Sequence, residues 1–203
     1  TVVGTTATVN NLPAGIYTLT VTDNCFTRTN NVTISEPAAL TLGASSKTDA
    51  SCNGSNTGSV IAGAVSNAVG IVQYSWKNSS NTVVGTTATV NNLPAGTYTL
   101  TVADNCFTRS NSVAINEPDV LNADVTHLNI SCFGSVDGTI TISSATGGFG
   151  TYEYSIDGGS TWSADGNFTN LSAGTYNVQM RDGAHPACTV TLENALEIIE
   201  PGV

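Results

Sequence analysis

Short runs of alternating apolar and polar residues recur along the chain, each bounded by Gly, Asn, Asp or Pro. They include YTLTV at 17–21 and again at 98–102, YNVQM at 176–180, and the runs at 58–62 and 138–142. Alternation with a period of two is typical of half-buried β-strands, and the bounding residues are those of tight turns. Helical periodicity is absent, so the pattern predicts an all-β chain.

The most regular block of runs lies between residues 40 and 116. It predicts seven strands, at about 40–50, 58–65, 71–77, 82–84, 87–91, 97–103 and 108–116. Seven short strands in a block of this length are typical of an immunoglobulin-like β-sandwich. We expect Tyr74 and Trp76 to anchor its core, as Tyr154 and Ile156 do in a later block.

The block repeats along the chain. Residues 1–37 return at 82–118 with six differences, an offset of 82 − 1 = 81 residues. SCNGSNTGSV at 51–60 returns as SCFGSVDGTI at 131–140. A fixed period near 80 residues indicates a tandem array.

The repeats predict the division of the chain. We expect a partial repeat at 1–39 and complete sandwich repeats at 40–120 and 121–203, cut from a longer protein. The dipeptide Glu-Pro ends each of them, at 36–37, 117–118 and 200–201. Proline there is expected to stop the last strand and to stiffen the connection to the next repeat.

Charge narrows the choice of partners. Five Lys and Arg against fifteen Asp and Glu give a net charge of −10. Nucleic acid and anionic membranes both require a basic surface, so we expect neither as a partner. Charged residues make up only 10% of the chain, against about 25% in ordinary soluble domains. Ser, Thr, Asn and Gly take their place, which is typical of extracellular β-proteins.

The five cysteines fall at repeated positions. Cys52 and Cys132 follow the first strand of a repeat, and Cys25, Cys106 and Cys188 precede the last. Pairing within a repeat gives Cys52–Cys106 and Cys132–Cys188 and leaves Cys25 unpaired. In a strict seven-strand path, however, these turns lie at opposite ends of the sandwich, which favours a bridge between neighbouring repeats such as Cys52–Cys188. A bridge needs α-carbons within about 7 Å, and both pairings stay open at this point.

Other motifs favour structural roles. SIDGGSTW at 155–162 resembles the Asp-box of sialidase propellers, where an Asp fixes a β-hairpin turn. Four aspartates precede glycine and would suit calcium loops: Asp137, Asp157, Asp165 and Asp182. However, Asp-Gly is common in turns, and no D-x-D-x-D string is present. The sequence lacks a carboxylate pair, a nucleophile elbow and a phosphate loop. We therefore expect no cofactor and no enzymatic activity.

The segment 131–182, followed by Cys188 and Glu200-Pro201, resembles the SprB repeat of very large cell-surface adhesins of gliding Bacteroidota. The repeat at 40–120 keeps the S-C-x-G-S, L-P-A-G-x-Y and E-P parts, and the partial repeat at 1–39 keeps the last two, but both lack the D-G-G-S-T-W hairpin. The resemblance implies a secreted protein exported by the type IX system, displayed at the cell surface and moved by the gliding motor. It implies no catalytic residue.

Two functions remain for the array. The first is a semi-rigid stalk or filament of an adhesin, whose partners are external surfaces or polysaccharides, neighbouring repeats, and the gliding and secretion machinery. The alternative is a carbohydrate-binding module array, in which exposed aromatic side chains contact the glycan. Trp162 and Tyr152 are the candidate ligand-contact residues, and an exposed Trp76 or Trp162 is what this alternative requires.

Overall fold

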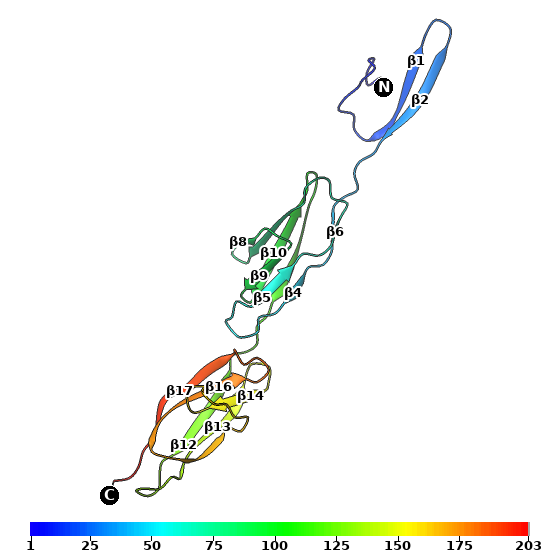
Figure 1. Cartoon of the computed structure of the whole chain (residues 1–203). Coiled ribbons are helices and arrows are strands. Elements are labelled where there is room, and N and C mark those ends of the chain that lie inside the picture. The colour runs from blue at the N-terminus through cyan, green and yellow to red at the C-terminus, as the bar shows by residue number, and fades with distance from the viewer. Residues whose placement is uncertain (203) are drawn as a thin grey trace.

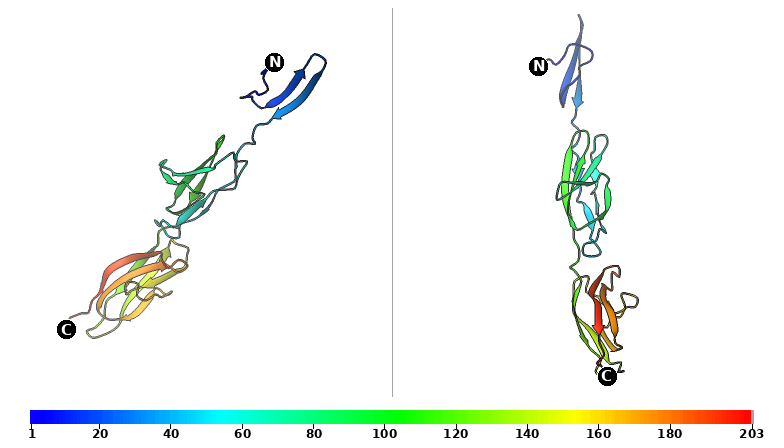
Figure 2. Two further views of the ribbon diagram at one scale, coloured as in Figure 1. Left: turned by 45° about the horizontal axis from the view of Figure 1, so that its top comes forward. Right: turned by 90° about the vertical axis from the view of Figure 1, so that its left-hand side faces the viewer.

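The computed structural model describes residues 1–202, which form three β-structured parts in a row (Figure 1). We call them the hairpin (15–34), unit 2 (40–116) and unit 3 (121–199). All three views show the parts end to end, with the two termini at opposite ends of an elongated molecule (Figures 1 and 2). The described residues contain seventeen strands and no helix. The predicted all-β class with sandwich repeats is confirmed, and the immunoglobulin-like topology stays a prediction.

Unit 2 is built from small antiparallel sheets. One has the order β11-β10-β7-β8, another the order β4-β5-β9, and β3 pairs with β6. The seven predicted strands correspond to nine, because the predicted strands at 40–50 and 58–65 are each interrupted and form two short strands. The bounds are β3 (Thr41–Leu42), β4 (Ser46–Thr48), β5 (Gly58–Ile61), β6 (Val65–Ser66), β7 (Gln73–Asn78), β8 (Val83–Gly85), β9 (Thr89–Leu93), β10 (Gly96–Ala103) and β11 (Thr108–Ile115).

The core of unit 2 is centred on Trp76. Its side chain is fully buried, and its indole Nε1 donates a hydrogen bond to the Thr87 carbonyl oxygen at 3.2 Å. Leu40, Leu100 and Val102 are also completely buried in the same cluster. An indole of this size buried with its N–H satisfied adds apolar area without leaving a polar atom unpaired. Trp76 therefore anchors the core, as predicted.

Unit 3 repeats the arrangement with two three-stranded sheets, in the orders β12-β13-β15 and β14-β16-β17. Tyr154 is buried in its core and Ile156 packs against it, again as predicted. The bounds of the strands are β12 (Asn122–Leu128), β13 (Gly138–Thr146), β14 (Tyr152–Ser155), β15 (Asn167–Leu171), β16 (Gly174–Asp182) and β17 (Thr189–Ile198).

The L-x-A-G-x-Y segments form the same turn in all three parts. In each, the tyrosine hydroxyl donates a hydrogen bond to the carbonyl oxygen four residues upstream, at 2.8, 2.9 and 2.8 Å for Tyr17, Tyr98 and Tyr176. This contact is the tyrosine corner that also occurs in immunoglobulin-like sandwiches. An asparagine in the left-handed region precedes each turn, at Asn11, Asn92 and Asn170. The repeated motif is therefore a fixed corner that starts the long strands.

The hairpin of β1 (Gly15–Thr22) and β2 (Thr27–Ile34) keeps the register of β10 and β11 but lacks a partner sheet. Leu19 and Val21 are 54% and 60% exposed, whereas the corresponding Leu100 and Val102 are fully buried. The apolar residues of the hairpin thus occupy positions that face the core in unit 2, but two strands alone cannot bury their side chains. No helix long and apolar enough to cross a membrane occurs in residues 1–202.

The junction between units as candidate functional site

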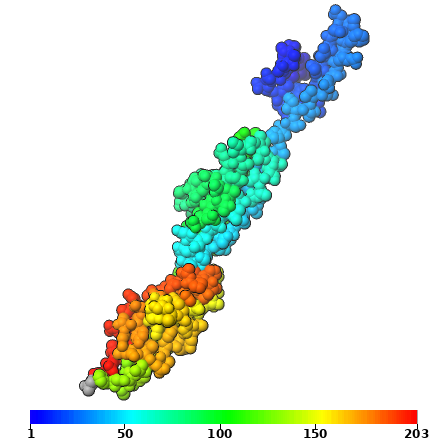
Figure 3. Space-filling view, viewed as in Figure 1, coloured from blue at the N-terminus to red at the C-terminus, as the bar shows by residue number. Residues whose placement is uncertain are grey.

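The repeated motifs of the chain meet where unit 2 joins unit 3. The β4–β5 loop carries Cys52 to the lower end of unit 2, and the β16–β17 loop carries Cys188 to the facing end of unit 3. The linker at 117–120 runs beside these loops. In the space-filling view the two units meet there in a continuous surface (Figure 3).

A disulfide bond crosses this junction. Cys52 is bonded to Cys188, with a Cα–Cα distance of 5.3 Å and a sequence separation of 136 residues. Pairing within a repeat, Cys52–Cys106 and Cys132–Cys188, is therefore wrong, and the alternative between neighbouring repeats holds. The reason is the predicted one, because the two cysteine-bearing turns of a unit lie at its opposite ends. Cys25, Cys106 and Cys132 are exposed and free.

Cys52 also contributes to packing across the junction. It is half-buried and packs against the hydrophobic cluster of unit 3, although it belongs to unit 2. Cys188 is 7% exposed and is part of that cluster. The bridge is thus shielded by apolar side chains, which limits the access of a reducing thiolate to its sulfur atoms.

The linker holds the Cys52 loop in place. The Gly54 N–H donates to the Glu117 Oε2 atom at 2.6 Å, and the Asn53 Nδ2 atom donates to the Pro118 carbonyl oxygen at 3.0 Å. Gly54 has a φ of +70°, a conformation that favours glycine over any residue with a side chain. The S-C-x-G-S and E-P motifs, more than 60 residues apart, are therefore two halves of one loop-and-cap structure.

The same structure occurs at the far end of unit 3. There the Gly134 N–H donates to the Glu200 carboxylate, and Gly134 has a φ of +77°. The Ile130 N–H donates to the Ile199 carbonyl oxygen at 3.1 Å, as the Ala50 N–H does to Asn116 at 2.9 Å in unit 2. The sequence pattern alone indicated no role for the glutamate of the Glu-Pro dipeptide. Its recurrence two residues beyond the end of the last strand was the available signal.

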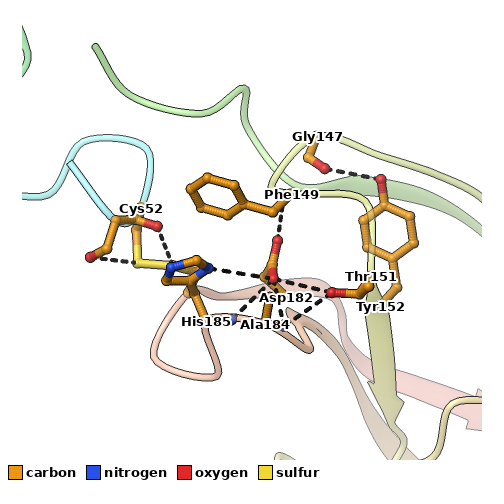
Figure 4. A network of polar contacts seen from close by, with 10 residues as sticks. Cys52, Gly147, Phe149, Thr151, Tyr152, Asp182, Ala184 and His185 are labelled. Atoms are coloured by element: carbon orange, nitrogen blue, oxygen red, sulfur yellow. Dashed lines mark hydrogen bonds and ion pairs between the residues drawn. A yellow bond between two sulfur atoms is a disulfide. The ribbon is translucent and has the colours of Figure 1, made fainter. Parts of the chain in front are cut away.

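The Cys188 loop is organised around Asp182 (Figure 4). Its fully buried carboxylate accepts hydrogen bonds from three backbone N–H groups, those of Phe149, Ala184 and His185. Burial raises the pKa of Asp182, but these donors and the nearby His185 outweigh it and hold the pKa below 3.8. The Asp182 N–H donates to the Cys188 carbonyl oxygen at 3.0 Å, which closes the loop.

The equivalent loops of unit 2 and of the hairpin are also held by an aspartate that accepts hydrogen bonds from backbone N–H groups. Asp104 accepts from the N–H groups of Val69, Cys106 and Phe107 at 2.8, 2.8 and 2.6 Å. Asp23 accepts from the N–H groups of Cys25 and Phe26. The bond from Val69 is the largest of the contributions that lower the pKa of Asp104. Each of these cysteines therefore sits in a turn that an ionised aspartate fixes.

A small cleft lies between the two units. Its volume is about 190 Å³, and residues of both units line it, among them Asn53 and Pro118 from one side and Leu121 and Val190 from the other. Clefts that bind small molecules are usually larger, about 300–1,000 Å³. The geometry of the junction is thus that of a covalent and hydrogen-bonded joint.

The aspartates that precede glycine serve as turn residues. Asp137 accepts from the N–H and hydroxyl of Ser131, and Asp165 from the N–H of Asn167. Among residues 1–202, no group of three or more His, Cys, Asp or Glu side chains is placed to hold a metal ion. The absence of a cofactor stays a prediction.

The SIDGGSTW segment forms the expected hairpin turn. Asp157 accepts from the N–H groups of Ser160 and Thr161, both at 2.9 Å, and from the hydroxyls of Ser155 and Thr161. The Thr161 hydroxyl contributes most to holding the pKa of Asp157 at about 2. The motif is structural in this chain, as predicted from the likeness to the Asp-box.

The two candidate ligand-contact residues are occupied by contacts within unit 3. Trp162 is half-buried, and its Nε1 donates a hydrogen bond to the Gly159 carbonyl oxygen at 3.0 Å. The guanidinium carbon of Arg181 lies over its ring, 4.3 Å from the ring centroid. Tyr152 is half-buried and donates to the Gly147 carbonyl oxygen at 2.9 Å. A role of either residue in ligand contact stays a prediction.

Comparison with known families identifies the repeats. The model of the SprB repeat matches residues 44–81 and 125–161. Each matched segment contains one S-C-x-G-S loop, with Cys52 in the first and Cys132 in the second. No curated protein matches the chain. The chain therefore carries two successive copies of the SprB repeat, one in unit 2 and one in unit 3.

Proposed function

We propose that this chain is a segment of a semi-rigid stalk in a large secreted adhesin, which serves surface attachment and gliding motility. The observation that carries the proposal is the disulfide between consecutive units. Two connections, the linker and the bridge, join unit 2 to unit 3, so rotation of one unit against the other is restricted. An elongated array with such joints transmits force over distance, as a stalk must.

Three further observations support this function. SprB repeats are found in cell-surface proteins, and disulfides persist in oxidising environments such as the cell exterior. The small fraction of charged residues and the negative net charge of −10 suit an extracellular surface that contacts neither nucleic acid nor anionic lipid. Glu117 and Pro118 of the linker bind the Cys52 loop of unit 2, which shortens the free part of the linker.

Small-angle scattering of the oxidised protein tests the stiffness. We expect the scattering of the oxidised chain to fit a single elongated arrangement of units 2 and 3, and that of the double variant Cys52→Ser/Cys188→Ser to require a range of bend angles. Cys106→Ser is the matched control, because its thiol is free and exposed. An oxidised chain as variable in shape as the double variant would refute the stalk.

A glycan array separates the stalk from an array of carbohydrate-binding modules. Residues 40–203, displayed in many copies so that weak contacts add up, are expected to give no specific signal. Trp76 is buried, so it cannot serve as the exposed aromatic side chain that a carbohydrate-binding module requires. A specific signal that is lost in Trp162→Ala or Tyr152→Ala would overturn the stalk in favour of glycan binding by the units themselves.

A further inference from the structure

The free end of unit 3 carries a second loop of the Cys52 type. The Ser135 N–H donates to the Cys132 carbonyl oxygen at 3.0 Å, as the Ser55 N–H donates to Cys52 at 3.2 Å. Glu200 caps the loop at Gly134 as Glu117 caps its counterpart at Gly54. The loop around Cys132 is thus already in the form that presents Cys52 to unit 3, yet its thiol is free and exposed.

The opposite end of unit 2 carries a loop of the Cys188 type. Asp104 fixes the turn that contains Cys106, as Asp182 fixes the loop that contains Cys188. In Figure 1 the turn between β10 and β11 lies at the end of unit 2 that faces the hairpin, away from unit 3. Each unit therefore has one cysteine loop of each type, and the two types lie at opposite ends.

We propose that Cys52–Cys188 is one link of a series that recurs at every junction of the array. In this series Cys132 pairs with the Cys188-type cysteine of a unit placed after Glu200-Pro201. Cys106 and Cys25 pair with Cys52-type cysteines of units placed before their own. The partner in each case is another copy of the same repeat. The inference goes beyond the stalk itself, because it assigns the connectivity of every cysteine and holds whether or not the array binds a surface.

The chemistry of each link is ordinary disulfide formation. Two thiols lose their protons, one S–S bond forms, and two electrons pass to an oxidant. The oxidant is a small-molecule or protein disulfide, which accepts the two electrons by thiol–disulfide exchange and is itself reduced to two thiols. The exposed thiols of Cys106 and Cys132 are accessible to such exchange.

The series makes the array almost inextensible. Tension that enters unit 2 at Cys106 follows the chain to Cys132 and leaves there for a later unit, a path of 132 − 106 = 26 residues. Fully extended, these residues span about 90 Å. They replace two repeats, or roughly 160 residues, which would otherwise release several hundred ångströms on unfolding. The residues between Cys52 and Cys106 and between Cys132 and Cys188 lie inside closed loops and carry no tension.

An extended chain tests the series directly. A second copy of residues 121–203 is joined directly after Val203, so that Gly202 and Val203 take the sequence positions of Asp119 and Val120 at the existing junction. After oxidation with oxidised glutathione and digestion without reduction, mass spectrometry is expected to find Cys132 bonded to the appended counterpart of Cys188. The Cys52–Cys188 bridge in the same molecule is the internal control.

Two outcomes would overturn the proposal. One is the alkylation of Cys132 by iodoacetamide in molecules whose Cys52–Cys188 bridge has formed. The other is a bond from Cys132 to any cysteine besides the appended counterpart of Cys188. A matched variant with Ser at that appended position is expected to leave Cys132 fully open to alkylation, which shows that the assay reports this bond.

Discussion

The disulfide between units 2 and 3 should decide how far the protein lengthens under tension. When both ends of the oxidised chain are pulled, tension reaches Cys52, crosses to Cys188 and continues to the C-terminus. Cys52 and Cys188 are 136 residues apart in the sequence, and the bridge closes the chain between them into a loop. That loop includes most of both units, and unfolding of the residues within it adds no length while the bridge is intact.

The expected difference follows from the length of the loop. At about 3.5 Å per residue, 136 residues span about 480 Å, and the Cα–Cα distance of 5.3 Å across the bridge replaces them. The fully extended oxidised chain should therefore be shorter than the reduced chain by about 470 Å. Only the residues outside the loop, 40–51 and 189–199 among those of the two units, lengthen the oxidised molecule when the units unfold.

Optical tweezers with handles at both termini measure this length. The reduced protein and Cys52→Ser/Cys188→Ser are expected to show unfolding of both units at full length. The oxidised wild type is expected to lack those steps, and addition of a reductant under tension should restore them. Cys106→Ser and Cys132→Ser should behave as the wild type does. Full-length unfolding of both units in an oxidised protein would refute the reasoning.

Three smaller predictions concern the turns and the hairpin. Replacing Glu117 by Ala removes the acceptor for the Gly54 N–H and should lower the free energy of unfolding of unit 2 by about 1 kcal/mol. Urea titrations measure this difference, and an unchanged free energy would show that the hydrogen bond does not stabilise the unit. The depressed pKa of Asp157 stabilises the fold above pH 3.8, and this contribution is lost as the pH falls through about 2. The difference in melting temperature between the wild type and Asp157→Asn should therefore shrink over that range, and a constant difference would contradict it. Leu19 and Val21 are exposed, so the full chain should enhance the fluorescence of an apolar dye, and removal of residues 1–39 should abolish the enhancement; equal fluorescence would argue against it.

The strands of both units were predictable because they depend on local pattern. Alternation marks β10 and β16, and the buried Leu100 and Val178 fall on the expected faces. The hairpin shows the limit of this reasoning. Leu19 has the same local sequence as Leu100, yet it is exposed because burial depends on a partner sheet that local pattern does not supply.

The junction was predictable only in part because its residues are distant in sequence. Repeated spacing identified all five cysteines, and the two ends of the sandwich already favoured a bridge between repeats. The roles of Glu117 and Asp104 were missed. Glu117 contacts a loop more than 60 residues away, which no local pattern reveals. Asp104 precedes Cys106 by two residues whereas Asp182 precedes Cys188 by six, so the different loop lengths hide the equivalence.

The most direct test of the account is the disulfide map of the oxidised chain. Digestion without reduction, followed by mass spectrometry, is expected to yield a peptide pair joined through Cys52 and Cys188, with Cys25, Cys106 and Cys132 open to alkylation. Peptide pairs joined through Cys52 and Cys106, or through Cys132 and Cys188, would contradict the central claim that the bridge connects consecutive units.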